Sequence, residues 1–268
     1  MNKNNYSPNR IICLTEEPTE TLYLLGEEHR IVGISTFTVR PPEAREEKPV
    51  VSSFLDAHIN KILDLKPDLV IGFSDIQSGI AEQLIKRGIT VWINNYRDVR
   101  GIKNMIFQLG SIVGKQNQAE ALISSIEDKF QKISTEIESW KIKPRVYFEE
   151  WDSPIITAIK WVSEIIKLSG GNHIFDDFAC KSLAKDRIIE DSKDLIKKNP
   201  DIILVSWCGK KFIKEKMTSR EGWDKINAVK NDFIYEIPSE IILQPGPASL
   251  TEGLDVIHTI LKSWYNNK

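Results

Sequence analysis

Several aromatic residues of this 268-residue chain stand where a short apolar run gives way to polar residues. Phe54, Tyr96, Trp151 and Trp207 are the main examples. An aromatic side chain at the start of a loop can stack on a flat apolar ligand, and that chemistry suits small-molecule binding. Ordinary packing beneath the loop is the alternative for each ring. The four residues therefore predict one face of a site for a large planar ligand.

Two adjacent carboxylates, Glu149 and Glu150, follow the apolar run RVYFE. In a strand, neighbouring side chains point to opposite faces, so one of the two should face a ligand. A functional Glu at this place could accept hydrogen bonds from ligand amides or pair with Lys210 or Arg187, and an internal ion pair is the alternative. Arg187, in AKDRIIE, could reach the same site or pair with Glu190.

Cys208, in SWCGKK, could coordinate a metal or react if its neighbours Lys210 and Lys211 lower its pKa. A small buried filler is the commoner role of a free cysteine. The four histidines show no HxH or HxxxH spacing, so a zinc site built from histidine alone is not expected. The sequence also lacks a Ser-His-Asp pattern, a nucleophile elbow, a phosphate-binding glycine loop and GxGxxG. We expect a protein without enzymatic activity, although an unfamiliar enzyme stays open.

Composition excludes several classes of partner. The net charge is −2 with both signs interspersed, which argues against nucleic-acid binding. No run approaches the roughly 20 apolar residues of a membrane span. The N-terminal MNKNNYSPNR is polar and lacks the apolar core of a secretory signal. As written, the chain is expected to be cytoplasmic, whereas a trimmed mature form would be periplasmic.

Strands and helices alternate along both halves of the chain, which is typical of α/β layers. The first half predicts strands at 10–14, 30–35, 68–73 and 89–93, helices at 19–26, 57–65, 76–87 and 99–113, and a charged loop at 41–49. The second half predicts strands at 145–149, 201–206 and 233–237, and helices at 161–168, 191–198 and 250–264. The segment DLVIGF is apolar at nearly every position, as in a parallel strand buried on both faces.

The stretch from Gln116 to Trp140 predicts one long helix between these halves. Its apolar residues recur at intervals of three and four, and it contains neither Gly nor Pro. A surface helix or a short coiled coil would show the same pattern. The two flanking halves share one order of helix end, Pro-Asp and buried strand, at ILDLKPDLVIG and LIKKNPDIILV. We therefore expect an N-terminal lobe at 1–115, a connecting helix at 116–141 and a C-terminal lobe at 142–268.

Ligands of parallel sheets lie beyond the carboxyl ends of the strands, so two such lobes would hold a ligand in a cleft between them. The residues expected to bind it all follow predicted strands or lie in nearby loops: Glu16, Phe37, Phe54, Phe73, Tyr96, Glu149, Trp151, Arg187, Trp207, Lys210 and Gln244.

Two Rossmann-like lobes joined by a helix resemble the class III periplasmic substrate-binding proteins, which serve cobalamin and siderophore ABC importers. The resemblance runs from about Arg10 to Trp264. Its first-half segments are RIICLTEEPTETLYLLG, RIVGIS, HINKILDLKPDLVIG and RGITVWINN, and KNPDIILVS follows in the second half. The subgroup of cobalamin-binding proteins is most similar, through EEWDSP, WVSEII, SWCGKK, GWD and ILQPGPASLTEGL.

The resemblance implies a rigid two-lobed binding protein for cobalamin or a related corrinoid or metal chelate, with no cofactor of its own. His58 could then provide an axial ligand to a cobalt centre, although a capping or surface role is the alternative. It also implies an ABC permease that docks on an acidic side chain of each lobe, but Asn60 stands at that position in the first lobe. We expect a monomer. A cytoplasmic enzyme or a metal or cofactor chaperone on the same fold is the alternative function.

Overall fold

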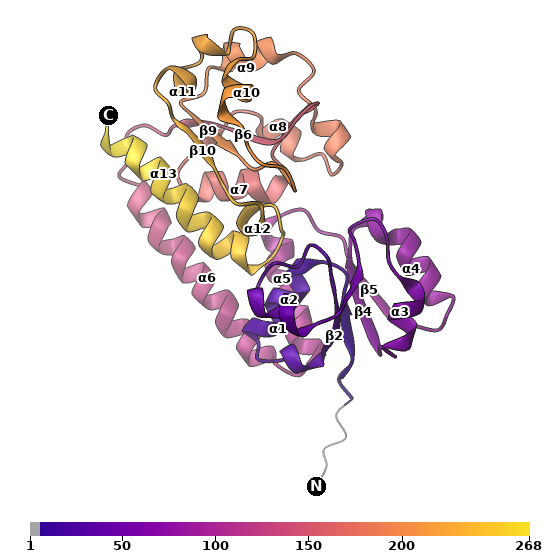
Figure 1. The fold of residues 1–268 in the computed structure, drawn as a ribbon. Helices are drawn as coiled ribbons and strands as arrows, with labels where there is room; N and C mark the ends of the chain where they lie inside the picture. Colours follow the sequence, from indigo (N-terminus) through magenta and orange to yellow (C-terminus); the bar gives the residue numbers. More distant parts are fainter. Residues whose placement is uncertain (1–5) are drawn as a thin grey trace. The chain divides into compact units, whose positions relative to one another are not determined.

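The computed structural model describes residues 6–268, and these residues divide into two compact units. Among the described residues, unit 1 comprises 6–96 and 100–125, and unit 2 comprises 97–99 and 126–268. Each unit contains a five-stranded sheet with helices, which confirms the predicted α/β fold class (Figure 1). Each unit is described by itself below.

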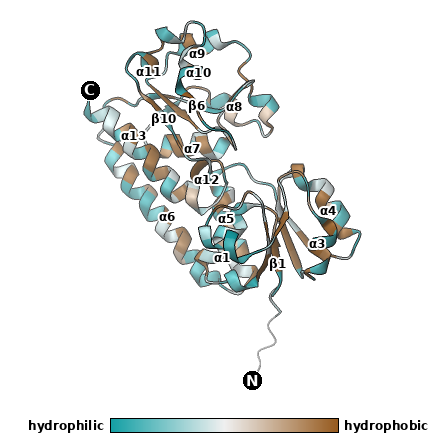
Figure 2. Cartoon of the chain, in the orientation of Figure 1, coloured by the Kyte–Doolittle hydropathy of each residue, from teal (hydrophilic) through white to brown (hydrophobic). Residues whose placement is uncertain are grey.

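The sheet of unit 1 is entirely parallel, in the order β3-β2-β1-β4-β5. Its strands are β1 (Ile11–Cys13), β2 (Ile31–Ser35), β3 (Val50–Ser52), β4 (Leu69–Phe73) and β5 (Val91–Asn94). All residues of β1 and β4 are buried, and the sheet is hydrophobic in Figure 2. This burial on both faces is the reason for the continuous apolar run at 69–73. Because all five strands are parallel, their carboxyl ends lie at one edge.

Helices cover this sheet and connect its strands: α1 (Glu16–Leu24), α2 (Pro42–Glu47), α3 (Ile59–Asp64), α4 (Ser78–Ile85) and α5 (Val99–Ile112). The predicted loop at 41–49 is wrong, because α2 occupies most of it. Pro42 stands in the first turn of α2, where a missing N–H costs no helical hydrogen bond. Aliphatic side chains between the sheet and the helices form the core: Ile12, Leu14, Val51, Ile62, Val70, Ile80 and Leu84.

The expected long helix is α6 (Gln116–Ile137), of which residues 116–125 belong to unit 1 and residues 126–137 to unit 2. Its predicted apolar positions Ala119, Ile126, Ile133 and Ile137 are buried. In unit 1, α6 crosses α5 so closely that a Cβ on Gly110 would collide with the Cβ of Ala119. Trp140 lies beyond the end of the helix, in unit 2, and stacks on Tyr265 with ring centroids 4.8 Å apart.

Unit 2 has a mixed sheet in the order β10-β9-β6-β7, with β8 also paired to β6. Only β7 runs antiparallel to its partner. The strands are β6 (Arg145–Asp152), β7 (Ile155–Thr157), β8 (Asn172–His173), β9 (Ile202–Val205) and β10 (Ile234–Glu236). The β6–β7 hairpin means that the strand predicted at 145–149 continues for three further residues.

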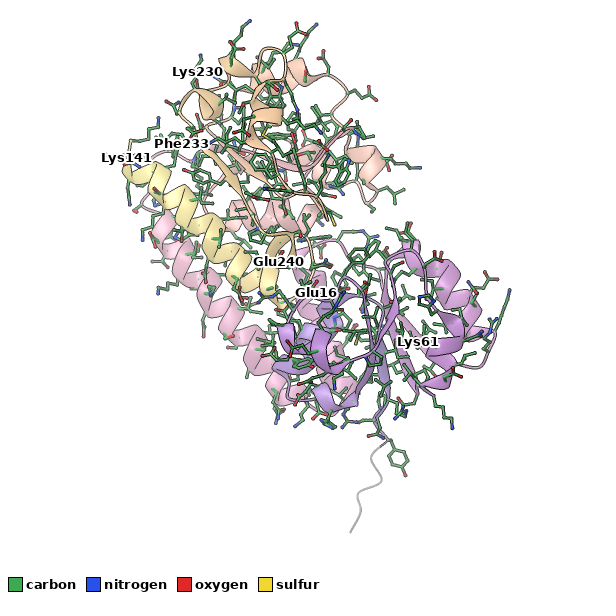
Figure 3. All side chains as sticks on the ribbon, viewed as in Figure 1. Glu16, Lys61, Lys141, Lys230, Phe233 and Glu240 are labelled. Atoms are coloured by element: carbon green, nitrogen blue, oxygen red, sulfur yellow. The ribbon has the colours of Figure 1, made fainter. Side chains whose placement is uncertain are left out.

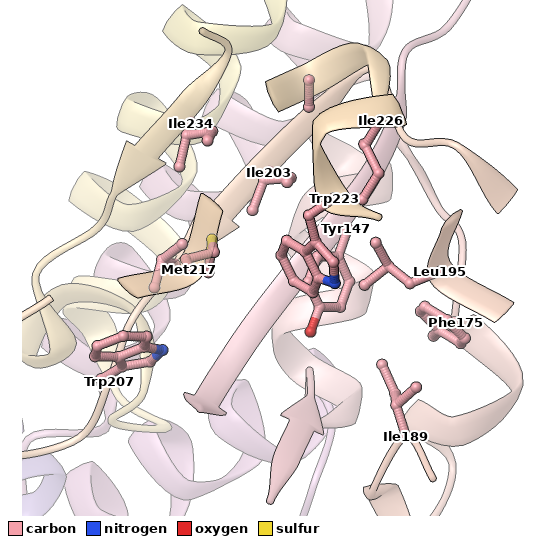
Figure 4. Packing of buried hydrophobic residues seen from close by; sticks show 12 residues of the cluster. Tyr147, Phe175, Ile189, Leu195, Ile203, Trp207, Met217, Trp223, Ile226 and Ile234 are labelled. Carbon is pink, nitrogen blue, oxygen red and sulfur yellow. The ribbon is translucent and has the colours of Figure 1, made fainter. Parts of the chain in front are cut away.

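The helices of unit 2 are α7 (Lys160–Leu168), α8 (Asp176–Ala179), α9 (Ser192–Lys198), α10 (Lys214–Thr218), α11 (Asn227–Lys230), α12 (Ser239–Ile242) and α13 (Leu254–Asn266). A turn of π-helix at Ser249–Gly253 leads into α13. One layer of the core is rich in aromatic rings, among them Tyr147, Phe175, Trp207 and Trp223 (Figure 4). In the part of the chain that the structure describes, no helix is long and apolar enough to cross a membrane.

Candidate functional site

The carboxyl edge of the unit 1 sheet exposes an unusual amount of apolar surface. Phe37 and Val39 follow β2, Leu55 follows β3 and Ile76 follows β4, and their exposed fractions are 48, 48, 70 and 44 %. Single exposed apolar residues are normal, but several in the loops of one sheet edge indicate a binding surface. We call these four residues the apolar edge of unit 1.

The other residues expected here are less exposed. Phe54 and Tyr96 are half-buried, whereas Phe73 is buried and packs edge-on against Tyr96 with ring centroids 5.3 Å apart. Glu16, labelled in Figure 3, is buried in the first turn of α1. The edge therefore presents Phe37, with parts of Phe54 and Tyr96, to solvent.

Gln77 holds three of these loops together. Its Oε1 accepts a hydrogen bond from the Phe73 N–H at 2.9 Å, and its Nε2 donates to the carbonyls of Leu14 at 3.3 Å and Phe54 at 3.2 Å. The side chain is fully buried, and Gly72 makes room for it, because a Cβ there would lie 2.7 Å from Gln77 Oε1. Gln77 is therefore a positioning residue for the carboxyl ends of β1, β3 and β4.

Replacing Gln77 by methionine should lower the free energy of unfolding of unit 1 by about 2–3 kcal/mol, because three backbone groups lose their partner in a buried place. Chemical denaturation followed by circular dichroism measures the change. The matched control is Gln83→Met on the exposed face of α4, with an expected change within about 0.5 kcal/mol. Equal effects of the two substitutions would contradict the positioning role.

Glu17 makes unit 1 sensitive to pH. Burial raises the pKa of this carboxyl to about 7, against a hydrogen bond that Thr15 Oγ1 donates at 2.8 Å. The folded state therefore holds a proton that the unfolded chain releases near pH 4.5, so ionisation of Glu17 lowers stability progressively from about pH 4.5 to 7.

Glu17→Gln should raise the free energy of unfolding by up to about 3 kcal/mol at pH 8 and by almost nothing at pH 4, since the amide keeps the acceptor and carries no charge. Denaturation curves of both proteins at the two pH values test this expectation. The exposed Glu46→Gln substitution should show no comparable gain. A gain that is the same at pH 4 and pH 8 would exclude ionisation as its cause.

In unit 2, Glu149 lies at the centre of a buried ion pair. Arg220 donates from Nη1 to Oε2 at 2.6 Å and from Nη2 to Oε1 at 2.9 Å, and Tyr147 Oη and Trp207 Nε1 donate at 2.9 and 3.1 Å. Burial raises the pKa of Glu149, against these four hydrogen bonds. Glu149 therefore forms an internal ion pair with Arg220, whereas the expected partner Arg187 binds its neighbour Glu150.

Lys210 and Lys216 both bind the carboxylate of Asp152, which lies at the end of β6. Lys210 Nζ lies 2.6 and 2.8 Å from the two oxygens, and Lys216 Nζ lies 2.5 Å from Oδ2. Burial of Asp152 opposes its charge, but the two lysines lower its pKa to about 2. Lys210 Nζ also lies 5.1 Å from the ring centroids of both Trp151 and Trp207. Trp207 is buried, so Lys210 covers it, whereas Trp151 is half-exposed.

Arg187 is also buried within unit 2. It donates to both oxygens of Glu150 at 2.5 and 3.0 Å and to the carbonyl of Thr157, and not to Glu190. Gln244 is half-buried just after α12. The structure thus brings Glu149, Trp151, Trp207 and Lys210 together with Asp152, which also follows a predicted strand, and with Lys216 and Arg220, which the sequence did not single out. Lys216 and Arg220 had one visible signal, the basic segment KKFIKEKMTSR.

The metal candidates do not form a cluster. Among residues 6–268, no group of three or more His, Cys, Asp or Glu side chains could hold a metal ion. His58 is exposed at the start of α3, and Cys208 is exposed after β9. Desolvation and the charge of Glu150 raise the pKa of the Cys208 thiol. The expectation that neighbouring lysines would lower this pKa is therefore wrong.

The buried residues Ser163 and His173 and the partly exposed Asp176 have the residue types of a catalytic triad in another order. Ser163 Oγ lies between the other two, 2.9 Å from His173 Nδ1 and 2.8 Å from Asp176 Oδ1. Burial lowers the pKa of His173 to about 3. Since Ser163 is buried and donates its hydrogen bond to Asp176, it is not an activated nucleophile. The hydrogen bonds among the three residues instead connect α7, β8 and α8.

Two hollows lie on the separate units. A groove of about 500 Å³ between α4 and β5 includes Ala81, Ile85 and Ile93. A pocket of about 430 Å³ beyond β9 and β10 is lined by Trp207, Gly209, Lys210, Glu236, Ile237, Pro238, Ser239 and Glu240. The pocket lies at the carboxyl ends of parallel strands, where α/β sheets place their ligands.

Comparison with known proteins agrees with this arrangement. The sequence profile described as "Periplasmic binding protein" matches residues 11–241. The ABC transporter substrate-binding lipoprotein YvrC of Bacillus subtilis is 27 % identical over 92 % of this chain and 78 % of its own length. The vitamin B12-binding protein of Vibrio cholerae is 25 % identical over 94 % of this chain and 89 % of its own length.

A solved structure shows the same fold. It is a possible iron-binding (periplasmic solute-binding) protein of Staphylococcus epidermidis, with a TM-score of 0.80 and 26 % identity over 95 % of this chain and 98 % of that chain. The resemblance noted in the sequence is thereby confirmed. The chain belongs to the periplasmic binding protein family, as a substrate-binding protein of the type that serves ABC importers.

Proposed function

We propose that this protein binds cobalamin, or a related corrinoid or metal-chelate ligand, at the carboxyl edges of its sheets. Substrate-binding proteins of ABC importers bind small molecules and pair with permeases. The observation that carries the proposal is the apolar edge of unit 1: Phe37, Val39, Leu55 and Ile76 are all substantially exposed in loops that follow parallel strands.

A corrin ring suits such a surface for a physical reason. It is broad and flat, so its faces gain from contact with aliphatic and aromatic side chains, while its peripheral amides need polar partners. Phe54 and Tyr96 supply further aromatic area in unit 1. The name of the Vibrio cholerae relative gives this ligand a precedent among similar chains.

The partner and the location follow from the same proposal. The relatives reported above are a lipoprotein and a protein described as periplasmic, so we place this chain on the outer side of the cytoplasmic membrane with a permease as its partner. Asn60 is exposed in the first turn of α3, and a permease contact there would be a neutral hydrogen bond.

Cyanocobalamin is coloured, so its retention through gel filtration tests the proposal. The wild-type chain should elute with the colour of the ligand. A Phe37→Ser and Leu55→Ser double variant should lose it, because both exposed side chains become polar. Leu24→Ser, which changes an equally exposed leucine at the end of α1, is the matched control and should retain it. Retention of colour by the double variant would contradict the role of the apolar edge.

A further inference from the structure

The cluster of Lys210, Lys216 and Asp152 carries more hydrogen-bond donors than it uses. Each ammonium has three N–H groups. Lys210 directs two of its donors at Asp152 and Lys216 directs one, so half of the six have no acceptor in these contacts. Asp152 is only 1 % exposed, whereas Lys210 and Lys216 are 35 and 52 % exposed. The unused donors therefore belong to side chains that solvent reaches.

The charges of the cluster do not cancel. One carboxylate neutralises one of the two lysines, and the neighbouring Glu149–Arg220 pair is balanced by itself. The cluster thus retains one positive charge at the end of β6. Glu236 and Glu240 line the same 430 Å³ pocket as Lys210. The positive charge is therefore confined to the part of the pocket that Lys210 borders.

The two ammonium groups are held in place. Lys210 lies over the rings of Trp151 and Trp207, and Lys216 Nζ lies 5.9 Å from the centroid of Trp207. Cation–π contacts and the hydrogen bonds to Asp152 already restrict the two lysine side chains. Less conformational entropy is therefore lost when these side chains bind a ligand. Arg220 directs two of its five donors at Glu149 and is only 17 % exposed, so it is less available to a ligand than the two lysines.

We propose that Lys210 and Lys216 form an anion-binding subsite that takes a carboxylate or phosphate group of the ligand. This inference rests on the proposed small-molecule binding and adds the chemical group that unit 2 recognises. Asp152 holds the two lysines side by side and competes with the ligand anion for them. Lys210 supplies the remaining donor next to the pocket, and Lys216 supplies two.

Pairs of flat ligands in which one member lacks the anionic group distinguish the two chemistries. Protoporphyrin IX and its dimethyl ester test carboxylates, whereas cyanocobalamin and dicyanocobinamide, which lacks the phosphodiester, test phosphate. Lys216→Met leaves Asp152 its contacts with Lys210 and should weaken binding of the anionic member about 10-fold, with no change for its counterpart. Lys211→Met, which changes an exposed lysine of the loop that precedes α10, is the control.

Asp152→Asn should change the affinity for the anionic ligand in the opposite direction. It frees both lysines from a competing charge, so the anionic member should bind more tightly, by about 10-fold. A merely structural role of Asp152 predicts weaker binding of both members. Equal affinities for the two members of each pair, or the same response of both members to Lys216→Met, would overturn the subsite while leaving corrinoid binding intact.

Inorganic phosphate tests the subsite without any ring. Trp151 and Trp207 lie beside the lysines, so phosphate should change the tryptophan fluorescence of the wild type and leave that of Lys216→Met much less affected. If phosphate acts in this way and no flat ligand binds, the subsite stands and the corrinoid proposal fails. If phosphate has no effect and no anionic probe is preferred, the subsite is wrong.

Discussion

Replacing Arg220 by methionine is expected to lower the free energy of unfolding of unit 2 by about 3–5 kcal/mol. The carboxylate of Glu149 is fully buried, and Arg220 supplies two of its four hydrogen bonds and the cation of its ion pair. Methionine is similar in length but brings no charge, so the variant leaves a buried anion with the Tyr147 hydroxyl and the Trp207 indole alone.

The loss of stability in Arg220→Met should depend on pH, and the pKa of Glu149 sets its direction. Burial already raises the pKa of Glu149, and removal of the guanidinium raises it further, so the variant takes up a proton on folding. The destabilisation should therefore be smaller at pH 5 than at pH 8. Intrinsic fluorescence follows this unit, because six of the seven tryptophans belong to it.

Lys197→Met is the matched control for Arg220→Met, since it removes one cation of an exposed i,i+3 pair with Asp194 in the same unit. Its expected effect is below about 1 kcal/mol. If Arg220→Met were no more destabilising than this control, or equally destabilising at pH 5 and pH 8, the ion pair would not stabilise unit 2 in the way described.

Trp223→Ala is expected to cost a similar amount, about 3–5 kcal/mol, through loss of packing. Trp223 is completely buried in the aromatic core layer of unit 2, where it packs edge-on against Tyr147 with ring centroids 6.3 Å apart (Figure 4). The guanidinium of Arg220 lies 4.5 Å from its ring centroid. Removing the indole thus leaves a cavity and deprives Arg220 of its support.

Trp223→Phe keeps an aromatic ring in the core but removes the indole N–H. It therefore separates the effect of packing from the effect of the N–H group. Nε1 of Trp223 is buried and has no hydrogen-bond partner among the described residues, so phenylalanine sacrifices no bond. We expect it to retain more than half of the stability that alanine loses. Urea denaturation of the three proteins provides the comparison. A phenylalanine variant as unstable as the alanine variant would contradict an account based on packing.

Helices and strands with a long, regular pattern of apolar residues were predictable from the sequence. The long helix and the buried strand Leu69–Phe73 appear close to their expected bounds, because many residues repeat one pattern. Strands β3, β7 and β8 have two or three residues each, which is too short for any period to show. The helix at Pro42–Glu47 begins at the second of two consecutive prolines and carries mostly charge, so its composition suggested a loop.

The candidate site residues were selected from the sequence by their place after strands, and their side-chain partners could not be selected in this way. Parallel strands place their carboxyl ends at one edge, which is why residues just after strands could be selected. Leu55 and Ile76 were missed because an apolar residue in a short loop reads as core until its exposure is known. Arg220 was missed because 71 positions separate it from Glu149, and nothing in a single sequence pairs residues at that distance.

Calorimetric titration of the intact chain with cyanocobalamin tests the central proposal most directly. The account predicts saturable binding with one ligand per chain, weakened strongly by the Phe37→Ser and Leu55→Ser double variant and unchanged by Leu24→Ser. Absence of saturable heat with the folded wild-type chain, together with an unchanged cobalamin absorption spectrum, would contradict cobalamin as the ligand.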